Sequence, residues 1–284
     1  MPFITAKDGT QLFWREWGQG APILFLNSLG CNSQMWDYQI VAFAEQGFRC
    51  IGFDRRGHGR SDQPGGGYDF DTFADDTARL VKELDLSGLT MISHSMAAGE
   101  IVRYLTRHGS SRIARAIFLA PMTPMLLQTK SNPNGIPRAN FEALWAQWKS
   151  DYSKWVEDAT APFFVPETSR AMMRWIGNVL QSPLPVNLAC SRMMVEADFR
   201  DEMQKIAVPT LIVHGDRDRS AANRGHRDPF SGADPWLSIP HLQGCAARPD
   251  VHAYGPAPRR HPAVYARAGV VRLRHHRIAI ADSK

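Results

Sequence analysis

LTMISHSMAAGE, residues Leu89–Glu100, joins an apolar run typical of a buried strand to a segment with helical spacing. Ser95 lies at the junction, and Ser93 and Ala97 stand two residues away on either side. A serine on such a tight turn exposes its hydroxyl, and small flanking residues let strand and helix approach each other. The stretch therefore predicts Ser95 as a catalytic nucleophile. A purely structural serine is the alternative.

Strand and helix patterns alternate on both sides of this turn. Short apolar runs that stop at glycine or polar residues predict strands, and apolar residues at helical spacing predict helices. The expected strands are residues 11–18, 21–26, 48–54, 89–93, 113–120 and 208–213, and the expected helices are residues 34–47, 71–86 and 96–109. This alternation favours a mostly parallel, doubly wound sheet with helices on both faces.

Between these core segments the pattern changes to long helical stretches at residues 141–159 and 169–180, which are rich in Trp and Met. We therefore expect a helical cap insertion of residues 122–207 within a core made of residues 1–121 and 208–284. The large side chains in the cap can pack between helices or line a binding site, and simple packing is the commoner role. They are Trp145, Trp148, Trp155, Trp175, Met172 and Met173.

Composition narrows the class of protein further. The chain has 284 residues and 44% hydrophobic content, but no apolar run long enough to span a membrane and no basic leader before an apolar stretch. We expect a cytoplasmic protein. Its four cysteines show no CxxC spacing, so neither a zinc site nor a disulfide framework is expected.

The net charge of +5 comes entirely from the C-terminal stretch. Residues 1–220 hold 23 basic against 24 acidic residues, whereas residues 221–284 hold 10 against 4. A basic tail can bind nucleic acid or an anionic membrane. Because this one has no sustained amphipathic period and few interleaved aromatic residues, we expect neither partner. The sequence leaves the oligomeric state open.

Four segments, all within residues 8–220, resemble the α/β-hydrolase superfamily, and most of all its cofactor-free (non-haem) haloperoxidase and arylesterase branch. The resemblance implies the α/β-hydrolase fold, no metal or organic cofactor, and hydrolysis of carboxylic esters through an acyl-enzyme. The segments stand in the family's order: NSLGCNSQMW (27–36), FDRRGHGRSDQP (53–64), SHSMAAGEIVRYLTRHGSSRIARAIFLAPMTP (93–124) and VPTLIVHGDRD (208–218).

The resemblance also implies roles for single residues. Ser95 would be the nucleophile and Asp218 the triad carboxylate, with Asp216 as the alternative acid. The backbone N–H groups of Leu29 and Met96 would form the oxyanion hole. The cap would lie over the nucleophile, where an apolar lining selects apolar or aromatic ester substrates.

Two motif details depart from or limit this resemblance. The family usually has His-Gly where this chain has Asn27-Ser28, but the oxyanion donors are main-chain groups, so the change need not abolish the hole. His58, in the glycine-bracketed turn RGHG, could act as a ligand or base. A role in shaping the turn is the stronger interpretation.

The histidine that would take the serine proton is missing from its place. In the resembled family it follows the acid by about 30 residues in a Gly-x-x-His loop, which points to about residue 247. The sequence there is Gly244-Cys245-Ala246-Ala247-Arg248. His241 and His252 are the nearest histidines, and neither follows a matching pattern.

The composition after Ala221 suggests a cause for this gap. The stretch has no glutamate, but it has nine arginines, seven prolines and six of the chain's ten histidines. We interpret it as GC-rich coding sequence translated in a shifted frame. Synonymous codons can be chosen for Gln243 to Tyr265 such that a reading one base later gives a peptide resembling the family's histidine loop and closing helix.

Taken together, these patterns predict a serine hydrolase that acts on carboxylic esters. Lactone hydrolysis, or perhydrolysis with haloperoxidase side activity, is a further reaction that the resemblance implies. A serine at position 95 argues against haloalkane dehalogenase and epoxide hydrolase chemistry, which need a carboxylate nucleophile. The alternative is a catalytically impaired, hydrolase-like scaffold that lacks the triad histidine.

Overall fold

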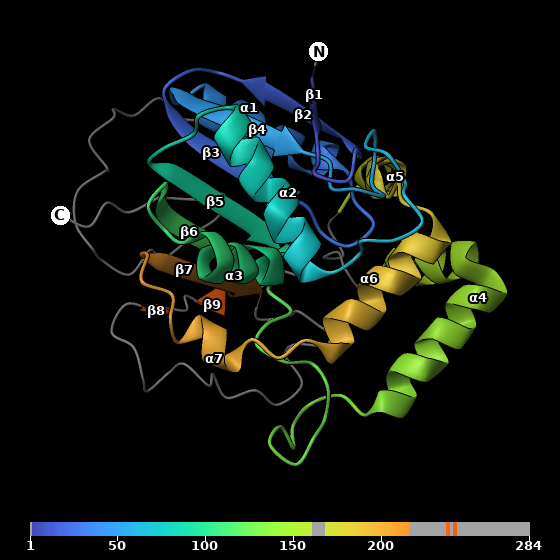
Figure 1. The fold of residues 1–284 in the computed structure, drawn as a ribbon. Coiled ribbons are helices and arrows are strands. Elements are labelled where there is room, and N and C mark those ends of the chain that lie inside the picture. Colours follow the sequence, from blue (N-terminus) through green and yellow to red (C-terminus); the bar gives the residue numbers. More distant parts are fainter. Residues whose placement is uncertain (1, 161–167, 216–236, 239–240, 243–284) are drawn as a thin grey trace.

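A mostly parallel sheet forms the centre of the computed structural model, which describes residues 2–160, 168–215, 237–238 and 241–242 (Figure 1). The strand order is β1-β2-β4-β3-β5-β6-β7-β8, and β9 also pairs with β7. The strands are β1 Phe3–Thr5, β2 Gln11–Trp17, β3 Ala21–Leu26, β4 Phe48–Phe53, β5 Leu89–His94, β6 Ile113–Leu119, β7 Thr210–Gly215, β8 Leu237–Ser238 and β9 His241–Leu242. Every strand expected from the sequence pattern is present.

Parallel pairing runs from β4 through β3, β5 and β6 to β7, whereas β1 and β2 are antiparallel. Strand β5 lies between β3 and β6, and all six of its residues are buried. A strand buried on both faces needs no alternation of buried apolar and exposed polar residues, and LTMISH accordingly contains no Asp, Glu, Lys or Arg. The expected doubly wound α/β fold is confirmed.

Alternate residues of β3 supply the two faces of the sheet. Leu24 and Leu26 belong to the cluster that packs under helices α2 (Phe70–Glu83) and α3 (Ala97–His108). Ile23 and Phe25 belong to the opposite cluster, which contains residues of helix α1 (Asp37–Ala44) and of the 3-10 turn η1 (Ser33–Trp36) before it. This period of two follows from strand geometry.

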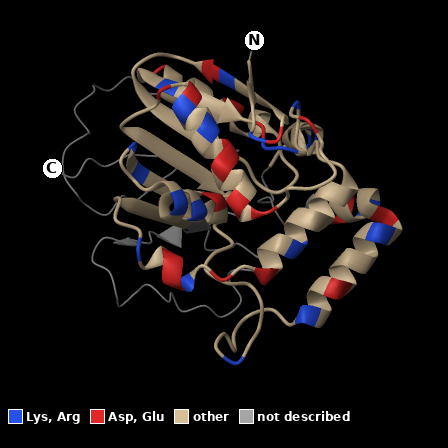
Figure 2. Ribbon diagram, in the orientation of Figure 1, with Lys and Arg blue, Asp and Glu red and all other residues tan. Residues whose placement is uncertain are grey.

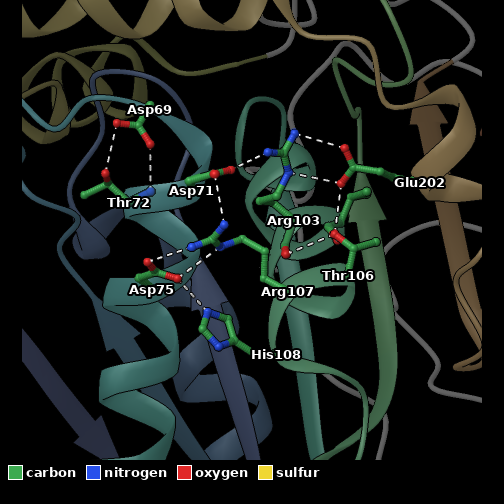
Figure 3. A network of polar contacts seen from close by, with 10 residues as sticks. Asp69, Asp71, Thr72, Asp75, Arg103, Thr106, Arg107, His108 and Glu202 are labelled. Carbon is green, nitrogen blue, oxygen red and sulfur yellow. Dashed lines mark hydrogen bonds and ion pairs between the residues drawn. The ribbon is translucent and has the colours of Figure 1, made fainter.

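The inner strands β3 and β5 carry no charged residues, which lie instead on helices, connecting segments and outer strands such as β2 (Figure 2). Among the residues that the structure describes, five charged side chains are nevertheless buried: Asp54, Arg55, Arg56, Asp76 and Glu100. Helices α2 and α3 are joined at their exposed edge by a network of ion pairs, in which Arg107 reaches Asp71 at 2.9 Å and Asp75 at 3.0 Å (Figure 3). Arg103 binds Asp71 and also Glu202 of helix α7 (Arg200–Met203), at 2.9 Å. Exposed pairs of this kind are individually weak, but the network holds the helix after Ser95 in register with its neighbours.

The segment expected to form a cap is helical, with α4 (Arg138–Thr160), α5 (Arg170–Val179) and α6 (Leu184–Glu196). Helix α4 is broken at Asp151, which has φ −154° and ψ 88° and whose carboxylate accepts the N–H of Lys154 at 2.9 Å. The sequence pattern predicted an unbroken helix there. Because Asp151 caps the second half, two shorter helices replace one long helix.

Three of the large aromatic residues of this region, Trp145, Trp148 and Trp155, pack together as expected, whereas Trp175 packs with Ile176 and Val179. Trp145 and Trp148 are 8% and 2% exposed and form a cluster with Leu126, Phe141 and Val195. We call this group, with the partly buried Tyr152 and Trp155 that pack against it, the cap aromatic cluster. The division into a core and a cap domain stays a prediction.

Membrane-spanning helices and metal clusters are both absent from the described residues. None of their helices is both long and apolar enough to span a membrane. They also contain no group of three or more His, Cys, Asp or Glu side chains arranged to hold a metal ion.

Candidate active site

Ser95 occupies the turn between β5 and α3 in a left-handed conformation, with φ 56°. A non-glycine residue there is uncommon and strained, so surrounding contacts must hold it in place. The Ser95 N–H donates to the carbonyl of Leu119 at 3.0 Å, and the Ser95 carbonyl accepts the N–H of Met122 at 3.3 Å. Ser93 and Ala97 have no exposed surface, as close packing of strand and helix requires. The strand-turn-helix context predicted for Ser95 is confirmed, and its catalytic role remains a prediction.

The predicted oxyanion donors lie at the ends of adjacent strands. Leu29 lies in the loop after β3, and Met96 stands between Ser95 and Ala97, the first residue of α3. Strands β3 and β5 pair in parallel with Leu26 opposite Ser93, so both loops leave the same edge of the sheet. Met96 is buried and Leu29 is half-buried. The topology therefore brings both predicted donors to the edge where Ser95 stands.

Asn27 anchors the loop after β3, residues 27–30, which contains the predicted oxyanion donor Leu29 and is called the oxyanion loop below. Its side chain is buried, its amide N–H donates to the Phe53 carbonyl at 2.7 Å, and its carbonyl oxygen accepts the Trp36 indole N–H at 3.1 Å. In addition, the Ser28 N–H donates to the thioether sulfur of Met35 at 3.3 Å. The asparagine that departs from the family's pattern thus fixes the loop with two buried hydrogen bonds.

A buried ion pair connects this loop to helix α3, which follows Ser95. Arg55 donates to one carboxylate oxygen of Glu100 from Nε at 2.8 Å and from Nη2 at 2.6 Å, and it also donates to the Asn27 carbonyl at 3.1 Å. The other Glu100 oxygen accepts the Thr77 hydroxyl at 2.5 Å. Motif spacing did not point to Arg55 and Glu100. Arg55 stands in a charged, glycine-rich turn and Glu100 in a helical segment, and nothing in either pattern indicated that the two would pair.

The RGHG turn is built around buried polar groups. The Asp54 carboxylate accepts the N–H groups of Ser33 at 2.6 Å and Arg60 at 3.0 Å. His58 is fully buried, with Nδ1 3.0 Å from the Arg56 carbonyl. Burial, with the nearby Arg55 guanidinium, lowers the pKa of His58 to about 3. A neutral, enclosed imidazole fits the expected role in shaping the turn.

The end of α5 and the segment that follows it bind two loops of the core, the loop that contains Asn32 and the RGHG turn. The Asn32 N–H donates to the Val179 carbonyl at 2.9 Å, and the Gly59 N–H donates to the Gln181 carbonyl at 2.8 Å. The Asn32 amide also donates to the Gln181 side chain at 2.9 Å. On the other side, Leu29 packs against the cap aromatic cluster. The cap and the oxyanion loop are therefore in direct contact.

The remaining predicted site residues cannot be placed in this arrangement. Asp216, Asp218 and His252 lie outside the described residues. His241 belongs to β9 and pairs with His214 of β7 through the backbone. The acid and the base of the triad stay predictions from the sequence.

The fold and the serine turn agree with a comparison to known families. A family model described as "alpha/beta hydrolase fold" matches residues 21–243, most of the chain. The chain belongs to the α/β-hydrolase family. The resemblance inferred from the four sequence motifs is thereby confirmed.

Relatives of this α/β hydrolase narrow the branch. The chain is 36% identical to a non-heme haloperoxidase of Rhodococcus erythropolis over 226 residues, covering 77% of this chain and 82% of the relative. It is 32% identical to a bifunctional esterase/perhydrolase of Acinetobacter calcoaceticus, covering 77% and 83%. The structure of a bromoperoxidase from Bacillus anthracis superposes with a TM-score of 0.80 at 27% identity, covering 86% of this chain and 92% of that one. These similarities place the hydrolase in the haloperoxidase and esterase branch of its family.

Proposed function

We propose that this α/β hydrolase is a serine esterase whose nucleophile is Ser95. The observation that carries the proposal is the left-handed turn at Ser95, set between a buried strand and a helix at the edge shared with the oxyanion loop. This is the geometry in which a serine hydroxyl is exposed and the N–H of the next residue is available to an oxyanion. The relatives named esterase/perhydrolase and haloperoxidase support the same chemistry.

The proposed reaction has two steps. Ser95 Oγ attacks the ester carbonyl, the Met96 and Leu29 N–H groups stabilise the oxyanion, and the alcohol leaves. Water then attacks the acyl-enzyme and releases the acid. If hydrogen peroxide replaces water in this second step, the product is a peracid, which accounts for perhydrolase and haloperoxidase side activity. Asp218 would orient the histidine that takes the Ser95 proton.

A second candidate function follows from the missing base. Residues 244–248 contain no histidine where the family's loop is expected, which favours an inactive scaffold that retains the hydrolase fold. Loss of the imidazole lowers turnover on the order of 10⁴- to 10⁶-fold. Sequencing the encoding DNA tests the frameshift explanation, because the neighbouring frame over Gln243 to Tyr265 must encode the histidine loop.

One pair of variants separates the two functions. The full chain is treated with a fluorophosphonate probe and assayed with p-nitrophenyl acetate, alongside Ser95→Ala and Ser93→Ala. Ser93 is the matched control because it lies on the same strand end, and its hydroxyl makes only a long contact of 3.4 Å to the Ile117 carbonyl. We expect labelling and hydrolysis in the parent and in Ser93→Ala, and neither in Ser95→Ala. Equal signals from the parent and Ser95→Ala would refute the nucleophile, and a parent without any signal would support the scaffold.

A further inference from the structure

The cap aromatic cluster holds a polar group that has no acceptor. Trp148 is 2% exposed, and its indole N–H has no hydrogen-bond partner in the part of the chain that the structure describes. Trp145 in the same cluster differs, because its N–H donates to the Ser191 hydroxyl at 2.9 Å. A buried donor without an acceptor is unfavourable and is rare in folded proteins unless a bound molecule supplies the acceptor.

A second donor faces the same cluster. Tyr152 contacts Trp148 with a ring separation of 5.5 Å, and its hydroxyl oxygen accepts the Asn187 amide N–H at 2.9 Å. Burial raises the pKa of Tyr152 to about 12, so its hydroxyl keeps its proton at neutral pH. Among the described residues no acceptor takes that proton. The unused polar groups of the cluster are therefore both hydrogen-bond donors, the Trp148 N–H and the Tyr152 O–H.

The position of the cluster connects it to the site. Leu29, whose N–H is a proposed oxyanion donor, and Met122, whose N–H binds the Ser95 carbonyl, both pack against it. Helix α4 carries Trp148 and Tyr152 on either side of its break at Asp151, and their rings are in contact. A substrate acyl group held beside Leu29 would therefore lie next to the cluster that contains these two donors.

We propose that Trp148 is a specificity-determining residue, whose indole N–H binds an oxygen acceptor in the acyl group of the substrate. The preferred substrates are then esters of keto or alkoxy acids, in place of purely hydrocarbon ones. This inference rests on the proposed esterase function and makes the expected apolar or aromatic substrate more specific. Both groups would donate to the same kind of ligand atom, an uncharged oxygen acceptor, because an ion would be costly among these rings.

The test compares two esters of nearly equal shape, p-nitrophenyl levulinate and p-nitrophenyl isocaproate, in which an acetyl group replaces an isopropyl group. The parent should prefer the levulinate in kcat/KM by about 3- to 10-fold, the effect of one neutral hydrogen bond. Trp148→Phe should lose this preference. Trp145→Phe makes the same change to an indole whose N–H is already used within the protein, so it should keep the preference.

A binding measurement separates this inference from the proposed catalysis. Calorimetric titration with levulinamide and isocaproamide, which lack an activated leaving group, should show the same preference in the parent and its loss in Trp148→Phe. A parent that hydrolyses neither ester but keeps this binding preference refutes the esterase and supports the subsite. If Trp148→Phe does not melt cooperatively, Trp148→Met takes its place, because it also lacks a donor. Equal binding of both amides by the parent, or a preference that survives the loss of the indole, would overturn the subsite.

Discussion

Removing the buried Arg55–Glu100 pair one partner at a time should cost more than removing both. In Arg55→Met, the Glu100 carboxylate stays buried with only the Thr77 hydroxyl as a donor. In Glu100→Leu, the guanidinium stays buried with the Asn27 carbonyl as its hydrogen-bonding partner. An unpaired buried charge typically costs about 3–5 kcal/mol, so each single variant should lose that much free energy of unfolding.

The double variant leaves no buried charge in this position. It loses the hydrogen bond from Arg55 to Asn27, the hydrogen bond from Thr77 to Glu100, and the contact of the guanidinium over the Phe73 ring at 5.1 Å. These neutral or singly charged contacts together amount to about 2–4 kcal/mol. The sum of the two single losses is about 6–10 kcal/mol, so the coupling energy should be at least about 2 kcal/mol.

Urea denaturation followed by tryptophan fluorescence measures all four proteins of this cycle. Arg103→Met and Glu202→Leu form the comparison cycle, because this pair also joins α3 to a neighbouring element but is partly exposed. That cycle should give a coupling of about 1 kcal/mol or less. If the Arg55 and Glu100 losses add to within about 0.5 kcal/mol, the two side chains do not act as one unit and the reasoning fails.

Three further predictions concern the turn and the loop beside this pair. Gly59→Ala should destabilise the protein by about 2 kcal/mol or more in urea melts, since Gly59 has φ 56° and an added Cβ would stand 2.2 Å from an Asp54 oxygen; an unchanged midpoint would contradict this. His58 has a pKa of about 3 in the folded protein, below its unfolded value of about 6.5, so its contribution is complete above pH 6.5 and is lost as pH falls toward 3. Unfolding experiments should show about 2 kcal/mol less stability at pH 5 than at pH 8, and His58→Gln should lack this component. Asn27→Leu removes the hydrogen bond to Phe53 and should lower kcat for p-nitrophenyl acetate by about 10-fold or more with little change in KM, and a change in KM alone would argue against its role in the oxyanion loop.

The sequence predicted the strands and helices of the core well because their periodic patterns are local. Leu24 and Phe25 lie on opposite faces of the sheet because neighbouring residues of a strand alternate. The small residues that permit the turn at Ser95 stand two positions away from it. The Arg55–Glu100 pair joins residues 45 positions apart, and no local pattern signals it. The break of α4 at Asp151 was missed because the aromatic spacing continues through it. The sequence therefore predicted features that depend on neighbouring residues, but it did not predict contacts between residues far apart in the chain.

The effect of a substitution in the candidate site depends on whether main-chain or side-chain atoms perform the function of that residue. Main-chain N–H groups of Leu29 and Met96 would hold the oxyanion, so an asparagine at position 27 serves as long as it shapes the loop, which its bonds to Phe53 and Trp36 do. A proton acceptor for Ser95 has no ready main-chain substitute, because efficient proton transfer needs a group whose pKa lies near the working pH, which a backbone amide lacks and an imidazole has. The turn, the loop and the cap of this hydrolase can therefore be intact while its activity depends on one imidazole. If the parent hydrolyses p-nitrophenyl acetate only weakly because it lacks this imidazole, restoring the neighbouring reading frame after Ala221 should raise turnover by several orders of magnitude and leave the binding preference that depends on Trp148 unchanged; equal turnover in both frames would show that the base is already present.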